Sequence, residues 1–380
     1  MLWWLWIYDP LTMIAMIVAY AVGYAALLFI ASIIAPRVAK KLTNKFSLYS
    51  SMAIAMATIL VSGLAGIFII SWILVQVSGL TLGFVWGLVL FIVIMNVFTY
   101  LVSPYMINLM YGAEYSYELQ EIVNRVASRA GIKKPPKAVI VRGPPNAFAY
   151  GNFITGKYVA ITTGMLKIVN QKELEAVIGH ELGHHRHKDT VIMLLLGIIP
   201  SVLYYLGIVL IRAGLLGGAA SSKDRRGGGG LPVLLVGIGA IVLSFILQIL
   251  VLAFSRLREY YADAHGALVA GNKNMQRALA KLYLYYDRYE RAQEYIRESK
   301  LRTLFIYALL DALANPLVPY IRYYGYHGLD RLDRHIDVDK AIEEIKRRKV
   351  HPAVELLSSH PPIPKRLAFL DRVVIERVKP

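Results

Sequence analysis

Long stretches without any charged residue alternate with polar segments along this chain. No Asp, Glu, Lys or Arg occurs in 11–35, in 46–113, in 190–211 or in 227–255. Because an α-helix rises 1.5 Å per residue, about 20 apolar residues cross the hydrocarbon core of a bilayer. The second run is long enough for two crossings, and Ser78-Gly79 marks a break between them. The pattern therefore predicts five membrane-spanning helices, at about 11–35, 51–77, 80–103, 190–211 and 227–255. For the last two, the alternative is a pair of long helices that pack on protein without spanning.

The polar segments predict a mostly helical soluble part with a small β-sheet. In 116–130, apolar residues recur at helical spacing and Gly131 follows them. These apolar residues are Leu119, Ile122, Val123 and Val126. Short β-like runs at Ala138–Val141 and Tyr158–Thr162 enclose a stretch rich in turn-forming residues. Together with the predicted spans, these elements indicate a mainly α membrane protein with a mostly helical soluble domain that carries the small β-sheet.

The segment His180-Glu181-Leu182-Gly183-His184 contains the residue types of a zinc-dependent amide hydrolase. Positions four apart lie on one face of an α-helix, so the two imidazoles can converge on one metal ion. Zinc lowers the pKa of a bound water from 15.7 to about 7, and Glu181 is close enough to take the proton and relay it to the leaving nitrogen. A polar turn of a surface helix is the alternative interpretation. The motif predicts one zinc ion per chain.

The third metal ligand distinguishes the classes of zinc protease. In metzincins the helix continues into a glycine and a further histidine, but His187 and Thr190 occupy those positions here. The other known solution is a carboxylate on a second helix, and Glu259 and Asp263 lie four apart on one helical face. We expect Glu259 to bind the metal and Asp263 to accept a hydrogen bond from a ligand histidine. His187 is a rival ligand for which we favour a structural or surface role, and His185 is expected to be a bystander.

Several motifs follow one another along the chain in a specific order. Ile178-Gly179-His180-Glu181-Leu182-Gly183-His184 precedes Ser255-Arg256, which leads into Glu259 and Asp263, and Ser359-His360-Pro361-Pro362 precedes Arg366. In this order the chain resembles the HtpX family of membrane-embedded zinc endopeptidases, which are related to the CAAX prenyl proteases. The agreement runs from about residue 114 to 372 and implies a zincin-like catalytic domain. The N-terminus departs from it, because we count three spans there and bacterial members are expected to have two.

The resemblance implies roles for residues outside the zinc motif. In such peptidases an edge strand with an Asn-Ala-aromatic sequence pairs with extended substrate, and we carry this substrate-binding role to Asn146 and Ala147. A β-turn asparagine without substrate contact is the alternative. His360 and Arg366 match the family's late motif, and a histidine or arginine on a separate loop can donate to the developing oxyanion. We therefore expect both residues near the catalytic Glu181.

The resemblance also suggests a physiological role, the proteolytic quality control of misfolded membrane proteins. Processing of lipid-modified substrates, as in the CAAX branch, is an alternative within the same class. A non-catalytic membrane scaffold with a vestigial metal site is an alternative of a different class. The presence of Glu181 and of three metal ligands argues against the scaffold.

The composition supports a membrane location. Fifty-seven per cent of the residues are apolar, yet 42 Lys and Arg against 25 Asp and Glu give a net charge of +17. Apolar spans with basic loops explain both values, so we attribute the charge to topology and to anionic lipid. The expected partners are protein or peptide substrates, chiefly membrane proteins, and the lipid bilayer, but neither nucleic acids nor nucleotides. Because the chain has no cysteine, disulfides, thiol catalysis and cysteine zinc ligands are excluded.

Basic loops also predict the orientation in the cell membrane. The loop after the first span is basic, contains no acid and should remain in the cytoplasm; it contains Arg37, Lys40, Lys41 and Lys45. The catalytic domain, formed by 114–189 and 256–380, would then lie at the cytoplasmic face. Residues 1–113 and the helical hairpin 190–255 would form the membrane region. The loop 212–230 would face outward although it carries four basic residues, which conflicts with the same rule.

Overall fold

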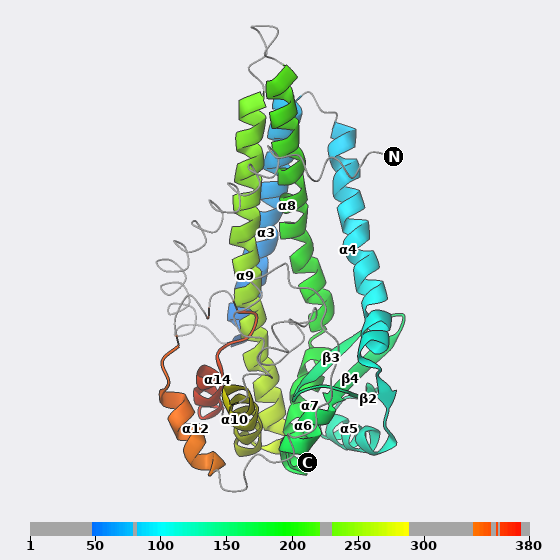
Figure 1. Cartoon of the computed structure of the whole chain (residues 1–380), viewed down its shortest axis with the longest axis vertical. Coiled ribbons are helices and arrows are strands. Elements are labelled where there is room, and N and C mark those ends of the chain that lie inside the picture. The colour runs from blue at the N-terminus through cyan, green and yellow to red at the C-terminus, as the bar shows by residue number, and fades with distance from the viewer. Residues whose placement is uncertain are drawn as a thin grey trace. The chain divides into compact units, whose positions relative to one another are not determined.

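The computed structural model describes residues 48–78, 82–220, 230–288, 337–350, 355 and 358–373 (Figure 1). The described residues are mostly helical and include one small sheet, as the sequence predicted. In chain order the elements are α3 (Leu48–Ser78), α4 (Leu82–Tyr111), β1 (Glu114–Tyr115), α5 (Tyr117–Arg129), β2 (Lys137–Val141), β3 (Ala147–Asn152), β4 (Gly156–Thr162), α6 (Thr163–Ile168), α7 (Gln171–Arg186), α8 (Asp189–Ala220), α9 (Gly230–Ala270), α10 (Asn272–Arg288), α12 (Val338–Arg347) and α14 (Ile363–Leu370). The first predicted span, 11–35, lies outside the described residues.

The other four predicted spans fall on the long apolar helices α3, α4, α8 and α9. Within the part of the chain that the structure describes, three segments are long and apolar enough to cross a membrane: Val85–Tyr111, Asp189–Leu215 and Gly230–Ala270. The apolar segment of α3, Met56–Trp72, is shorter. Helix α9 has 41 residues and continues well beyond residue 255, where we expected the span to end. A change from apolar to polar side chains marks the end of the apolar surface there, while the backbone stays helical.

The chain divides into two compact units, each of which we describe by itself. The first contains α3, α4 as far as Thr99, and Ile192–Phe254. Its apolar core includes Ile59, Ile199, Leu203, Leu206 and Phe254. The second unit comprises Tyr100–Val191 and the chain from Ser255 onwards. The division on α4 lies inside the helix, whereas we placed the domain boundary after it, at 113–114.

The second unit contains the sheet, with strand order β1-β2-β4-β3. β2 and β4 are parallel, and β3 and β4 form an antiparallel hairpin in which Phe148 pairs with Ala160 and Tyr150 with Tyr158. The predicted runs Ala138–Val141 and Tyr158–Thr162 are confirmed as parts of β2 and β4. β3 lies at one edge of the sheet and so has backbone groups that β4 does not use.

Helices pack onto this sheet around one apolar core. The helix predicted over 116–130 is confirmed as α5, and the Ser116 side chain caps it by accepting from the N–H of Leu119. The buried apolar residues of α5 join those of α7, α10, α12 and α14 in the same cluster, among them Val123, Ile178, Leu182, Leu282, Ile342 and Leu367. The helix α7, which contains the zinc motif, is therefore enclosed.

Candidate metal centre

The zinc motif lies on α7, a helix whose beginning is firmly defined. Asn170 accepts from the N–H of Glu173, and the Glu173 carboxylate accepts from the N–H of Asn170, both at 2.9 Å. Glu173 is fully buried and also pairs with Arg277 and Lys281 of α10. The motif that follows is buried too, with His180 and Glu181 each 2% exposed. This burial contradicts the alternative of a polar turn on a surface helix.

Glycines allow α7 and α9 to approach closely. A methyl group on Gly179 would lie 3.1 Å from the Cα atom of Gly266, and one on Gly266 would lie 2.6 Å from the carbonyl oxygen of Ala176. Larger residues at these two positions would push the helices apart. Because the backbones touch, short side chains from α9 can reach the histidines of α7.

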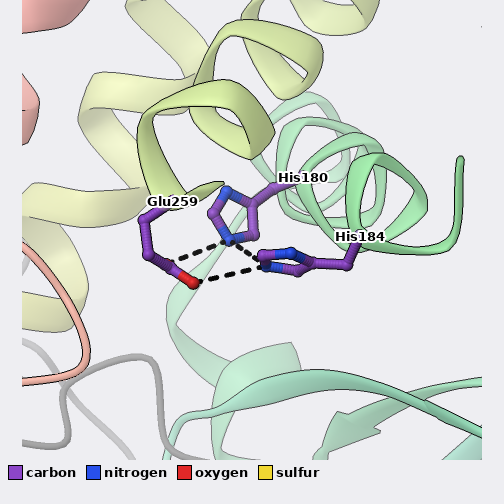
Figure 2. Close-up of side chains that lie close together, drawn as sticks. All are labelled: His180, His184 and Glu259. Carbon is purple, nitrogen blue, oxygen red and sulfur yellow. Dashed lines mark hydrogen bonds and ion pairs between the residues drawn. The ribbon is translucent and has the colours of Figure 1, made fainter. Parts of the chain in front are cut away.

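Three ligand atoms converge between the two helices. Figure 2 shows His180 and His184 projecting from α7 towards Glu259 of α9. The Nε2 atoms of the two histidines lie 3.2 Å apart. Glu259 Oε2 lies 3.7 Å from His180 Nε2, and Glu259 Oε1 lies 3.5 Å from His184 Nε2. Two ligands at about 2.05 Å from zinc in tetrahedral geometry are about 3.3 Å apart, so these spacings suit a zinc ion.

The neighbours of the two histidine rings favour the tautomer that a metal site requires, with the proton on Nδ1. His184 Nδ1 lies 2.6 Å from an oxygen of Asp189, and His180 Nδ1 lies 3.0 Å from an oxygen of Asp263. With the protons on Nδ1, both Nε2 atoms present lone pairs to each other and to the Glu259 carboxylate. Three acceptors at this spacing repel one another unless a cation lies between them. His180, His184 and Glu259 could thus hold one metal ion.

The carboxylate behind His180 is held by an arginine. Arg366 of α14 donates to Asp263 through Nε, at 2.7 Å, and through Nη2, at 2.5 Å. Neither side chain is exposed. A bidentate pair in a dry site fixes the carboxylate in position and angle. Arg366 therefore reaches the histidine through Asp263, and its Nη1 lies 3.7 Å from Glu259.

The carboxylate behind His184 is held in a similar way. Arg258, which precedes Glu259 on α9, places Nη2 2.8 Å from the same Asp189 oxygen that contacts the histidine. Lys188 has a φ of 54°, in the left-handed region, and this turn between α7 and α8 brings Asp189 back towards the histidine. Each histidine thus has a carboxylate and an arginine behind it.

Glu181 is buried beside this cluster and contacts the sheet. Its carboxylate accepts a hydrogen bond from the backbone N–H of Ala149 on β3. Burial raises the pKa of Glu181 to about 7, and the nearby Glu259 charge acts in the same direction, while His184 opposes it. A metal ion bound by His180, His184 and Glu259 would lower the pKa of Glu181, in the same direction as the His184 charge.

His360 and Arg366 of the late motif both lie near the metal ligands, but they differ in exposure and in the residue that each contacts. His360 Nδ1 is 3.0 Å from Glu259 Oε2, and the His360 side chain is 16% exposed. Arg366 is enclosed and turned towards Asp263. Of these two residues, His360 is thus the one that is partly accessible from solvent.

The remaining sequence candidates lie around the centre. Ala147 begins the edge strand β3, and Asn146 precedes it with its N–H donating to Thr162 at 2.8 Å; both residues are 1% exposed. His187 packs edge-on against Tyr261 at 4.6 Å and is absent from the cluster of three ligands. His185 is buried, and its Nε2 lies 2.8 Å from the Tyr158 carbonyl. Burial lowers the pKa of His185 to about 4.

Sequence reasoning missed Asp189 and Arg258. Asp189 follows His184 by five positions, which is off the helical face, and only the turn at Lys188 brings it back. Its position directly before an apolar run was the only available signal. Arg258 is adjacent to Glu259, but adjacent residues of a helix point in different directions.

Comparison with known proteins finds a matching family and several similar proteins. The model of peptidase family M48 matches residues 114–374. A protein named Protease HtpX homolog from Pyrobaculum aerophilum is 47% identical over 97% of this chain and 99% of the relative. One of the same name from Archaeoglobus fulgidus is 46% identical over 97% of this chain and 98% of the relative. The crystal structure of S. mikatae Ste24p has a TM-score of 0.46 and 17% identity, covering 85% of this chain and 66% of that chain.

The family match covers more than half of the chain, and the relatives align with nearly all of it. The resemblance that the motifs indicated is thus confirmed, and membership implies a metal-dependent protease. Together with the apolar helices, these matches show that the chain belongs to peptidase family M48, as a membrane-associated metalloprotease of the HtpX type.

Proposed function

We propose that this protease is a zinc endopeptidase that binds one zinc ion per chain through His180, His184 and Glu259. The observation that carries the proposal is the convergence of three acceptor atoms between α7 and α9, with spacings of 3.2 to 3.7 Å. When bound there, zinc would lower the pKa of a water molecule to about 7 and polarise the scissile carbonyl. Water or substrate would take the fourth position.

Glu181 acts as the general base. Its carboxylate accepts a proton from the attacking water and then donates that proton to the leaving amide nitrogen. Its place beside the ligands, on the same helical turn as His180, supports this role. Asp263 and Asp189 accept the Nδ1 protons of the two histidines and so orient both rings.

His360 donates to the oxygen of the scissile carbonyl as negative charge develops on it. Its distance of 3.0 Å from Glu259 and its partial exposure support this assignment. Arg366, for which the sequence suggested the same role, is better suited to positioning, because its guanidinium is enclosed against Asp263.

The edge strand β3 binds extended substrate by backbone pairing. Asn146 and Ala147 lie where this strand begins, and the N–H of Ala149 on the same strand already reaches Glu181. A peptide that pairs with β3 would pass the general base. Backbone pairing gives affinity without a sequence preference, which suits a protease of unfolded chains.

The physiological role we propose is quality control of misfolded membrane proteins, at the cytoplasmic face of the cell membrane. The catalytic domain would comprise 114–189 and 256–380, and residues 1–113 and 190–255 would form the membrane region. Processing of lipid-modified substrates is the competing role. Cleavage of a prenylated peptide, compared with cleavage of unfolded casein by the same detergent-solubilised protein, distinguishes the two.

Metal analysis and one variant test the centre. The purified wild-type protein should contain one zinc per chain and should lose casein cleavage with a chelator. Glu181→Gln removes the base but no ligand, so zinc should remain while cleavage falls by orders of magnitude. Zinc-free folded protein would contradict the ligand set, and near wild-type turnover of the variant would remove Glu181 from the mechanism.

Labelling in intact cells tests the orientation. Glu344 is an exposed residue of α12, and the chain has no cysteine of its own. A cysteine introduced at Glu344 should react with a membrane-impermeant thiol reagent only after the cells are broken. Labelling from outside would invert the proposed topology.

A further inference from the structure

The turn that joins β3 to β4 exposes two large apolar side chains. Phe153 and Ile154 at its tip are 81% and 58% exposed. The surface of α4 within the same unit is apolar as well, with Tyr105, Leu109 and Met110 all exposed. An apolar pair fixed at the tip of a turn is unfavourable in water and marks a surface that meets an apolar partner.

The side chain of Asn152 attaches this turn to α4. Its Nδ2 amide donates to the backbone carbonyls of Tyr100 and Leu101, at 3.2 and 2.9 Å. In a regular helix the Tyr100 carbonyl accepts from the N–H of residue 104, but Pro104 has no N–H. Two side chains donate to this carbonyl instead, the Ser103 hydroxyl at 3.1 Å and Asn152. The turn is therefore bound at one defined height of α4, and Figure 1 shows the strands beside the lower end of that helix.

Tyr100 and Leu101 lie in the membrane-crossing part of α4 wherever the bilayer is placed along it. The candidate span Val85–Tyr111 has 27 residues, and about 20 of them cross the hydrocarbon core. Every stretch of about that length within the span contains both Tyr100 and Leu101. The height at which the turn is bound is therefore a height inside the hydrocarbon.

The Asn152 side chain provides a partner for several polar groups of the turn. Asn152 Oδ1 accepts from the N–H groups of Ile154 and Thr155, each at 2.9 Å, and from the Thr155 hydroxyl at 3.2 Å. Irregular backbone is tolerated at membrane depth only where its polar groups have partners in the protein. The Asn152 side chain thus pairs two backbone amides of the turn and also donates to two carbonyls of α4.

The strand β3 runs along α4 towards the same height. The hydroxyl of Tyr150 donates to Asn108, and two residues later Asn152 reaches the carbonyls of Tyr100 and Leu101. Proceeding along β3 therefore means moving from the end of the span into it. Phe153 and Ile154 follow at the tip.

We propose that the turn 152–155 is a lipid-inserted anchor, in which Phe153 and Ile154 enter the acyl chains of the bilayer. The strand it holds also reaches the proposed general base, because the N–H of Ala149 donates to Glu181. At about 3.3 Å per residue, Ala149 and Asn152 are about 10 Å apart. On the proposed function, on which this step rests, a peptide paired with β3 is cleaved next to the lipid. The substrates so favoured are membrane-proximal segments of membrane-anchored proteins.

Depth-dependent quenching tests the insertion without relying on activity. Phe153→Cys in the full chain, labelled with a polarity-sensitive fluorophore, is placed in phosphatidylcholine vesicles. A doxyl group on the lipid chains should quench this label, its emission should be blue-shifted, and aqueous iodide should quench it little. A label at Glu344→Cys, on exposed α12, is the control and should respond to iodide alone.

Two results would overturn the insertion. Quenching of the Phe153 label by iodide alone would place the turn in water. A blue-shifted label that neither quencher reaches would show that protein covers the turn, either another segment of this chain or a second copy.

A pair of double variants tests the consequence for substrates. Phe153→Ser with Ile154→Ser should lose cleavage of a membrane-anchored peptide in vesicles while keeping cleavage of casein in detergent. Phe153→Leu with Ile154→Leu, which keeps the apolar surface, should retain both activities. An equal loss of both activities in the serine variant would show that the turn merely supports the fold. A wild-type protein without any cleavage would contradict the proposed function, and the quenching result would still decide the insertion.

Discussion

The two histidines of the metal centre are supported by matching chemistry from different parts of the fold. Behind His180, Asp263 lies one turn after Glu259 on α9 and is held by Arg366 through two hydrogen bonds, with both side chains fully enclosed. Behind His184, Asp189 comes from the turn between α7 and α8. It shares one oxygen between the histidine and Arg258, at 2.6 and 2.8 Å, and the two side chains are 5% and 9% exposed.

The pairs Asp263–Arg366 and Asp189–Arg258 differ in how much each contributes to folding as well as to metal binding. A bidentate ion pair without water is strongly destabilising to break, because the partner left behind is a buried, unpaired charge. A pair that is joined through a single shared oxygen and keeps slight access to solvent loses less. We therefore expect the pair Asp263–Arg366 to be required for folding and for metal binding. The pair Asp189–Arg258 should matter chiefly for metal binding.

The largest effect is expected for the arginines. Arg366→Leu leaves Asp263 buried without its partner and should destabilise the protein by roughly 3–5 kcal/mol. Thermal unfolding in detergent should show a large fall in the midpoint. Arg258→Leu is the matched variant and should lower the midpoint less. Equal losses in the two variants would remove the distinction between the supports.

Loss of the Asp263 charge should be the next largest effect. Asp263→Asn keeps the shape of the side chain but weakens the acceptor for His180 Nδ1, so zinc affinity should fall by roughly 10–100-fold. Competition with a chromophoric chelator measures this, and the unfolding midpoint of the apoprotein shows whether the fold persists. Unchanged affinity together with an unchanged cleavage rate would assign Asp263 to the fold alone.

The smallest effect is expected at Asp189. Asp189→Asn should lower zinc affinity by about 10-fold, at the weak end of the range for such carboxylates, because the amide oxygen can still accept from His184 Nδ1. It should lower the unfolding midpoint of the apoprotein less than the Arg366 variant does. Zinc affinity equal to wild type would show that His184 is oriented by its packing instead.

Local regularities explain which parts of this centre could be read from the sequence. His180, His184, Glu259 and Asp263 are pairs spaced by four, and a helix places such pairs on one face whatever surrounds it. The membrane helices were predictable for a related reason, since the hydrocarbon core of a bilayer favours an uncharged apolar run of about 20 residues. Composition and spacing along the chain suffice for both.

Contacts between distant elements were decided only by the tertiary structure. Arg366 was expected to donate to substrate, but the position of α14 turns it towards Asp263. Asp189 reaches His184 because one left-handed residue reverses the chain, and the same five-residue spacing in a continuous helix would separate them. The hydrogen bond from Asn152 to the Tyr100 carbonyl, which lacks a helical N–H donor because residue 104 is proline, joins residues about 50 positions apart. Such pairings depend on how elements pack, and packing energy is shared among many residues, so no local pattern in the sequence encodes it.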